Sequence, residues 1–184
     1  MAMKMRQTCL RALLAMLPCL ASATTGAVAD DCDAVTPKEL ASALASRYAD
    51  WKPLRLSDLP EDDQALWLKV HGTGCPGLAR GNFTGTHGLQ FGVLLWQEEP
   101  RRQLQLLFAE QDATGHYRFT RILYQRVDRL SVVFVSPPGH YRRHDHRGAP
   151  VHVTSDAIIM ETIEAGTTAF YMTRGKFRTI AISD

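Results

Sequence analysis

The chain has 184 residues, with 21 basic and 19 acidic side chains, a formal net charge of +2 at pH 7 and 45% hydrophobic residues. Three of the basic residues lie in the first 29 positions, which hold no acidic residue, so 18 basic and 19 acidic residues remain beyond them. A nearly neutral remainder gives no electrostatic reason to expect nucleic acid or an anionic membrane surface as a partner.

Residues 1–29 have the layout of a secretory signal peptide. Basic residues are followed by an apolar stretch over 12–20 and then by the small-residue pattern Ala27-Val28-Ala29, which is typical of a cleavage site. The apolar stretch is shorter than the roughly 20 residues that a membrane-spanning helix needs, and no later run supplies one. We therefore expect a cleaved chain with one domain over 30–184, located in the periplasm or secreted.

Two of the four cysteines, Cys32 and Cys75, lie beyond the predicted signal peptide. An isolated pair in an oxidising compartment is most simply a disulfide bond. Closing a loop of that length would stabilise the fold by roughly 4 kcal/mol on the chain-entropy model. The alternative, a reactive thiol, would need a basic or histidine neighbour.

The first part of this domain has two helix patterns. Thr36-Pro37-Lys38-Glu39 combines a capping box with proline at the first helical position, and apolar residues then recur at Leu40, Leu44 and Tyr48. A second helix is predicted over 60–72, because acidic residues open it and a glycine closes it.

From about residue 78 the pattern changes to short β-type runs separated by turn residues. The predicted strands span 91–96, 103–108, 117–124, 130–135, 157–163, 169–172 and 177–182. No helix-length segment separates these strands, so parallel crossovers have no chain to be built from. The predicted fold class is therefore α+β, with two N-terminal helices followed by an antiparallel β meander in a single domain. Residues 136–150 form the one long irregular segment.

One segment resembles a known calcium loop. Gly81-Asn82-Phe83-Thr84-Gly85-Thr86-His87-Gly88-Leu89-Gln90-Phe91-Gly92-Val93-Leu94-Leu95 matches, without a gap, the G-D-F-N-G-D-G-x-x-D-Y-A-V-L-L pattern of FG-GAP/VCBS-type, integrin-like calcium loops. A single copy of such a loop also occurs in small exported bacterial proteins. These proteins, like this chain, have a Cys-Pro-Gly turn before the loop and a strand pair at the C-terminus.

The resemblance implies calcium ligands at Asn82, Thr84, Thr86 and Gln90. Calcium is a hard cation that prefers several oxygen ligands, with carboxylates foremost, and none of these four side chains is a carboxylate. We therefore expect a degenerate loop that keeps its shape without the ion, and no cofactor.

The irregular segment over 136–150 is the candidate recognition surface. It combines Tyr141 with Arg142, Arg143 and Arg147, which are residue types enriched in interface hot spots. Its charge implies an acidic groove on the partner, where arginine can pair with carboxylates.

The same region is the densest concentration of possible transition-metal ligands. These are His140, His144, His146 and His152. Three or four such groups can form a metal site, although the interleaved arginines oppose a cation. The alternative function is therefore a metal-binding protein or a hydrolase that uses this histidine-rich loop over 140–152.

The sequence lacks several common catalytic motifs. The patterns G-x-S-x-G, H-E-x-x-H and S-x-x-K and a Cys-His signature do not occur in the sequence. The sequence therefore predicts an exported non-catalytic binding domain, such as an inhibitor or immunity-type protein. Its partner would be another exported protein or an enzyme of the envelope.

Overall fold

The computed structural model describes residues 30–86, 88–98, 101–145 and 148–183. The predicted signal peptide over 1–29, together with His146 and Arg147 of the predicted sites, lies outside the described residues. Of the described chain, 44% is strand and 19% is helix. The protein is therefore mostly β.

The helices are short, and a strand lies among them. In chain order they are α1 (Cys32–Val35), α2 (Lys38–Arg47), the 3-10 helix η1 (Leu56–Asp58) and α3 (Glu61–His71), with strand β1 (Lys52–Pro53) between α2 and η1. Helix α3 begins with three acidic residues and ends at Gly72, whose φ of 63° suits glycine. The predicted capping box of α2 does not form, because the Thr36 hydroxyl donates to the carbonyl oxygen of Cys32 instead.

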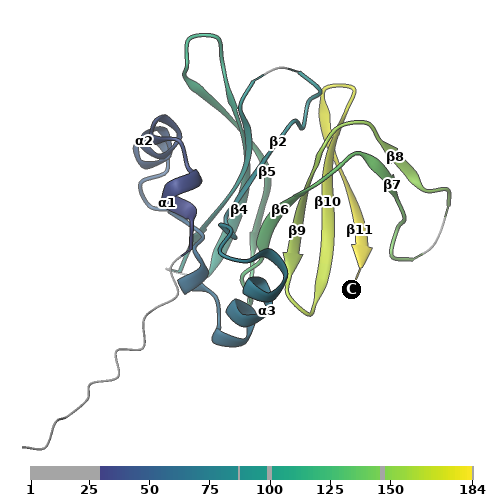
Figure 1. Cartoon of the computed structure of the whole chain (residues 1–184), viewed down its shortest axis with the longest axis horizontal. Helices are drawn as coiled ribbons and strands as arrows, with labels where there is room; N and C mark the ends of the chain where they lie inside the picture. Colours follow the sequence, from purple (N-terminus) through teal and green to yellow (C-terminus); the bar gives the residue numbers. More distant parts are fainter. Residues whose placement is uncertain (1–29, 87, 99–100, 146–147, 184) are drawn as a thin grey trace, which may run out of the picture.

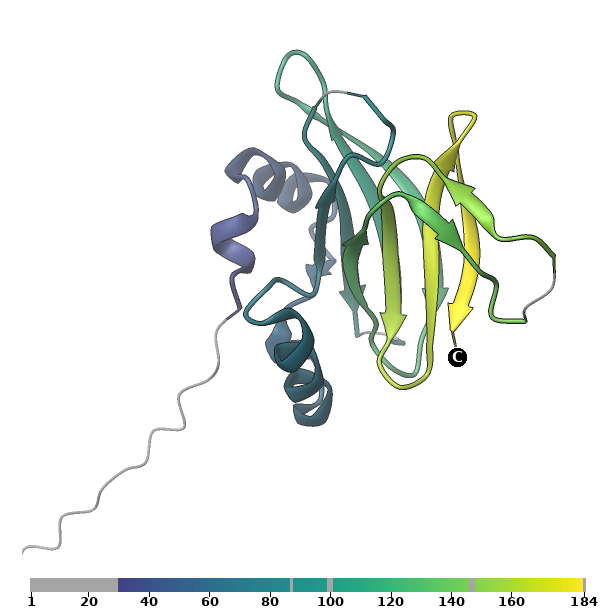
Figure 2. The same cartoon turned by 45° about the vertical axis from the view of Figure 1, so that its right-hand side comes forward.

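The strands form three antiparallel sheets (Figures 1 and 2). The first has the order β1, β3 (Gln90–Gln97), β4 (Gln103–Gln111) and β5 (Tyr117–Arg126), and β2 (Leu78–Gly81) also pairs with β3. The second has the order β11 (Lys176–Ser183), β10 (Gly166–Thr173), β9 (Ala157–Thr162) and β6 (Val132–Ser136). The third is the pair of β7 (Gly139–Tyr141) and β8 (Val151–Val153).

Three hydrophobic clusters hold these layers together. The largest lies between the first two sheets, where Leu94 and Leu106 meet Ile158 and Phe170. A second joins the opposite face of the first sheet to α2, and a third lies under the β7–β8 pair on the outer face of the second sheet. Strand β3 is apolar along almost its whole length because it is buried on both faces.

The two large sheets approach each other closely at Gly92. A Cβ atom at this position would lie 2.8 Å from the Cδ1 atom of Ile158, which belongs to β9 of the second sheet. Any larger residue at Gly92 would therefore push the sheets apart or displace Ile158.

The predicted α+β class is wrong. The helices do not form a block ahead of the strands, and the strands do not form one meander, because they divide into three sheets and β6 pairs with β9 instead of β5. Residues 136–150 are also not wholly irregular, because they contain β7. The physical reason is that alternation of apolar residues identifies strands, whereas strand pairing depends on contacts between residues far apart in the sequence.

Candidate functional site

The loop that resembles a calcium site is organised by the side-chain amide of Gln90, which is 1% exposed. Its Oε1 atom accepts hydrogen bonds from the backbone N–H groups of Phe83 at 2.7 Å and Thr84 at 3.1 Å. Its Nε2 atom donates to the hydroxyl groups of Thr84 and Thr86. One amide therefore satisfies both backbone and side-chain groups of the loop.

Two carboxylates from elsewhere in the chain form hydrogen bonds with residues of this loop. Asp156 accepts a hydrogen bond from the backbone N–H of Asn82 at 2.8 Å, and Glu110 accepts one from Nε2 of Gln90 at 3.4 Å. The Gln90 amide thus bonds to both backbone and side-chain groups of the loop, and the expectation that the loop holds no ion remains a prediction. The family resemblance itself remains a prediction.

Strands β7 and β8 place two of the four candidate histidines directly opposite each other. His140 pairs with His152 across the strands, and their ring centroids are 4.7 Å apart. His144 lies further along the chain, where its backbone N–H donates to the carbonyl oxygen of Ala181 at 2.8 Å. Among the described residues, no group of three or more His, Cys, Asp or Glu side chains is placed to hold a metal ion.

Tyr141 stabilises the β7–β8 pair. Its hydroxyl group hydrogen-bonds with the Ser136 hydroxyl at 2.8 Å and with the carbonyl oxygen of Pro137 at 2.7 Å. Its ring packs with Val151 and Val153 over the second sheet. Tyr141 therefore holds the strand pair on the domain, and most of its bonding capacity is used within the fold.

Two arginines of the predicted recognition surface lie within the described residues, and their side chains are available to bind a partner. Arg142 and Arg143 are exposed and have no hydrogen bond or ion pair with any other described residue. Together with Gly148 and Pro150 they line a hollow of about 260 Å³, which we call the arginine hollow. Each guanidinium presents a planar set of N–H donors that matches a carboxylate or a phosphate group.

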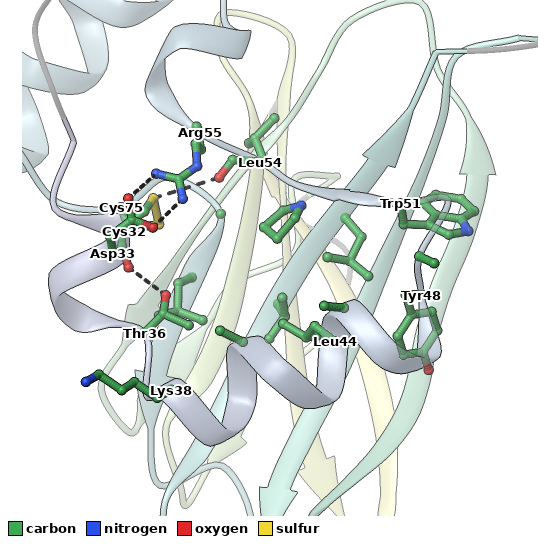
Figure 3. Close-up of a pocket in the computed structure, with 18 residues that line it drawn as sticks. Cys32, Asp33, Thr36, Lys38, Leu44, Tyr48, Trp51, Leu54, Arg55 and Cys75 are labelled. Carbon is green, nitrogen blue, oxygen red and sulfur yellow. Dashed lines mark hydrogen bonds and ion pairs between the residues drawn. A yellow bond between two sulfur atoms is a disulfide. The ribbon is translucent and has the colours of Figure 1, made fainter.

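A second site, which the sequence did not indicate, lies between α2 and the first sheet (Figure 3). This α2 cavity has a volume of about 410 Å³. Its apolar walls include Ala41, Leu44 and Ala45 of the helix and Val93 and Leu95 of β3. The alanine spacing along the helix was visible in the sequence, but small residues at that spacing equally suit close packing, so the spacing alone predicts no cavity.

The predicted disulfide between Cys32 and Cys75 is present, and its two Cα atoms are 4.6 Å apart. It forms one end of the α2 cavity. Beside it Arg55 forms an ion pair with Asp33. The hydrogen bond and charge of Arg55 hold the pKa of Asp33 below its usual value, and the same hydrogen bond raises the pKa of Arg55.

The buried serines do not form nucleophile–base pairs. Ser131 shares a hydrogen bond with the Thr162 hydroxyl at 2.7 Å, and the Ser155 hydroxyl donates to the carbonyl oxygen of Phe83 at 2.8 Å. Neither of these two hydrogen bonds involves a histidine, so the geometry of Ser–His catalysis is not formed at these positions.

No family model, curated protein or solved structure matches this chain. Within the described part of the chain, no helix has the length and apolar character needed to cross a membrane. The disulfide is consistent with an oxidising compartment.

Proposed function

We propose that this protein is an exported, non-catalytic binding domain of the periplasm or extracellular space. It acts as an inhibitor or immunity-type protein on an enzyme of the envelope. The observation that carries this proposal is the arginine hollow, in which Arg142 and Arg143 are exposed and unpaired among the described residues. The partner chemistry that fits this hollow is an acidic cleft, where carboxylates can accept paired hydrogen bonds from each guanidinium.

The strands that flank the arginine hollow are held on the domain, which favours a role in recognition. The β7–β8 pair projects from the side of the molecule opposite to α1 and α2 (Figures 1 and 2). Its inner face packs on the second sheet through Tyr141, Val151 and Val153. The two strands that flank the loop with Arg142 and Arg143 are thus fixed on the domain, and fixed loop ends lower the entropic cost of association.

The test is capture of an envelope partner by the immobilised full chain. We expect the double variant Arg142→Ala/Arg143→Ala to keep its fold and to bind the captured partner more than about 30-fold more weakly, which corresponds to about 2 kcal/mol. The matched control is Arg118→Ala/Arg126→Ala, because both arginines are exposed on β5, in the other large sheet. Binding should also weaken as salt concentration rises. Equal capture by the wild type and the hollow variant would contradict the proposal.

A second candidate function, metal binding, is favoured by the facing pair of His140 and His152. Imidazole nitrogen is a good ligand for zinc, copper and nickel ions, and two facing rings can supply two ligands while water fills the other positions. Zinc titration of the purified protein tests this function, because His152→Ala should abolish binding that His116→Ala retains. Equal zinc binding by these two variants would remove this candidate.

A further inference from the structure

The α2 cavity has an apolar body with charged groups at one end (Figure 3). Trp51 and Tyr48 lie at one end of the helix-lined wall, and the charged residues Asp33, Lys38 and Arg55 lie toward the other. Small-molecule sites in proteins have volumes of roughly 300–1,000 Å³ and mostly apolar walls with a few polar groups. The cavity, at about 410 Å³, falls within this range.

The walls of the cavity are fixed by backbone contacts. Strand β1 is paired with β3, and the backbone N–H of Leu54 donates to the carbonyl oxygen of Leu94 at 3.0 Å. Opposite Leu54, a Cβ atom at Gly77 would lie 2.2 Å from the Leu54 carbonyl oxygen, so the chain passes too closely for any side chain there. Movement of this wall toward the helix, which would close the cavity, would therefore break hydrogen bonds of the sheet.

The helical wall leaves the cavity open to solvent. Ala41 and Ala45 line it one turn apart, and both are exposed even though they face an apolar space. Leu44, between them in the sequence, is 5% exposed and packs on the sheet. The helix is thus anchored by its leucines, while its alanines border the opening.

The charged end holds one cation that has no partner among the described residues. Arg55 forms an ion pair with Asp33 and also lies 3.6 Å from a carboxylate oxygen of Asp30. Lys38 has no hydrogen bond or ion pair with any other described residue. An anionic group placed at Lys38 would therefore gain an unpaired ammonium partner, which a cationic or neutral group would not.

We propose that the α2 cavity binds an amphipathic molecule with a single apolar chain and an anionic head group, of the chemical class of an alkyl carboxylate. The chain lies along Ala41, Ala45 and Trp51, and the head group lies at Lys38. This site is independent of the arginine hollow, because α2, which lines the cavity, and the β7–β8 pair, whose connection lines the hollow, lie on opposite sides of the molecule (Figure 1).

The experiment is calorimetric titration of the full chain, with its disulfide formed, against octanoate, decanoate and dodecanoate below their micelle concentrations. The Kd should fall about fourfold for each added methylene until the cavity is filled. Dodecanol should bind more weakly than dodecanoate, and dodecyltrimethylammonium more weakly still. Failure of all three dodecyl compounds to bind would overturn the proposal, and so would tighter binding of the cation than of the carboxylate.

Two pairs of variants locate the site. Ala45→Phe should fill the cavity and weaken dodecanoate binding at least tenfold, whereas Ser46→Phe places the same ring on the same helix but outside the cavity. Lys38→Ala should weaken dodecanoate binding about threefold to fivefold and leave dodecanol binding unchanged, and Lys69→Ala on α3 is its control. Ala41→Phe provides a second cavity-filling variant if Ala45→Phe does not fold.

These variants also separate the proposal from its alternatives. Unchanged dodecanoate binding by the filled variants would show that the ligand lies elsewhere and would overturn the proposal. The cavity could instead hold a second copy of the chain. In that case the wild-type protein would sediment as a dimer and bind no dodecanoate, and Ala45→Phe would be a monomer. This result would also overturn the proposal.

Discussion

At the scale of one residue, Gln90 organises the loop that resembles a calcium site. Its buried amide bonds to two backbone N–H groups and two hydroxyl groups of the loop. We expect thermal melting curves recorded with calcium and with a chelator to overlay, because those groups are already satisfied. A clear rise in melting temperature with calcium would contradict this account.

Replacing Gln90 should destabilise the folded protein, because these hydrogen bonds would be lost. Gln90→Leu would leave the N–H groups of Phe83 and Thr84 without their acceptor, so the free energy of unfolding should fall by about 2–3 kcal/mol in urea titrations. Gln125→Leu, on the edge strand β5, is the matched control and should change that free energy by less than about 0.5 kcal/mol. Similar values for the two variants would show that the amide does not organise the loop.

His71 gives the fold a dependence on pH. Its ring lies 4.1 Å from that of Trp67 and 4.7 Å from that of Phe134, and burial lowers the pKa of His71 below the usual 6.5, with a smaller opposing effect from Glu161. The unfolded chain then binds more protons than the folded chain between the lowered pKa and about 6.5. Stability should therefore be full above about pH 6.5 and should fall as the pH drops through that window.

Urea titrations at a series of pH values from about 8 to 5 would measure this effect. His71→Gln should flatten the fall in the free energy of unfolding over this range. Parallel curves for the wild type and His71→Gln would show that His71 is not responsible.

At the scale of elements, the sequence predicts the long strands well and the short ones poorly. The seven predicted strands correspond to β3, β4, β5, β6, β9, β10 and β11, and the two predicted helices correspond to α2 and α3. Strands β1, β2, β7 and β8 were missed because two to four residues are too few to show alternation. Their positions are set by pairing with another strand, which the pattern within so short a segment does not contain.

The candidate sites also differ in how far the sequence predicts them. The cysteine pair needed no geometry, since two cysteines can pair in one way. The cavity required the structure, because it depends on how α2 lies over the sheet. Tyr141, which the sequence grouped with the recognition residues, turned out to contact Ser136 and Pro137 within the domain.

The β7–β8 pair should therefore depend on the Tyr141 hydroxyl. Tyr141→Phe keeps the ring but removes two hydrogen-bond contacts, so the free energy of unfolding should fall by about 1 kcal/mol, and amide exchange of β7 should accelerate. Tyr171→Phe is the control, because its ring packs in the same hydrophobic cluster. Unchanged exchange in Tyr141→Phe would show that the ring alone holds the strands.

At the scale of the whole molecule, the two-sheet sandwich separates two surfaces of different chemistry. The disulfide and α2 border an apolar cavity on one side, and the connection between β7 and β8 carries exposed arginines on the other. A rigid scaffold with function at its periphery is a common arrangement for recognition, because loops and hairpins there can vary without loss of the core.

We propose that the protein inhibits an enzyme of the envelope through the arginine hollow, and the activity of that enzyme is the decisive measurement. The activity of the captured partner should be measured while wild-type protein is added, and again with Arg142→Ala/Arg143→Ala. We expect activity to fall to a low plateau with the wild type, and the variant to require more than about 30-fold higher concentration for the same loss. Partner activity that stays unchanged with saturating wild-type protein, or that falls equally with both proteins, would contradict the account.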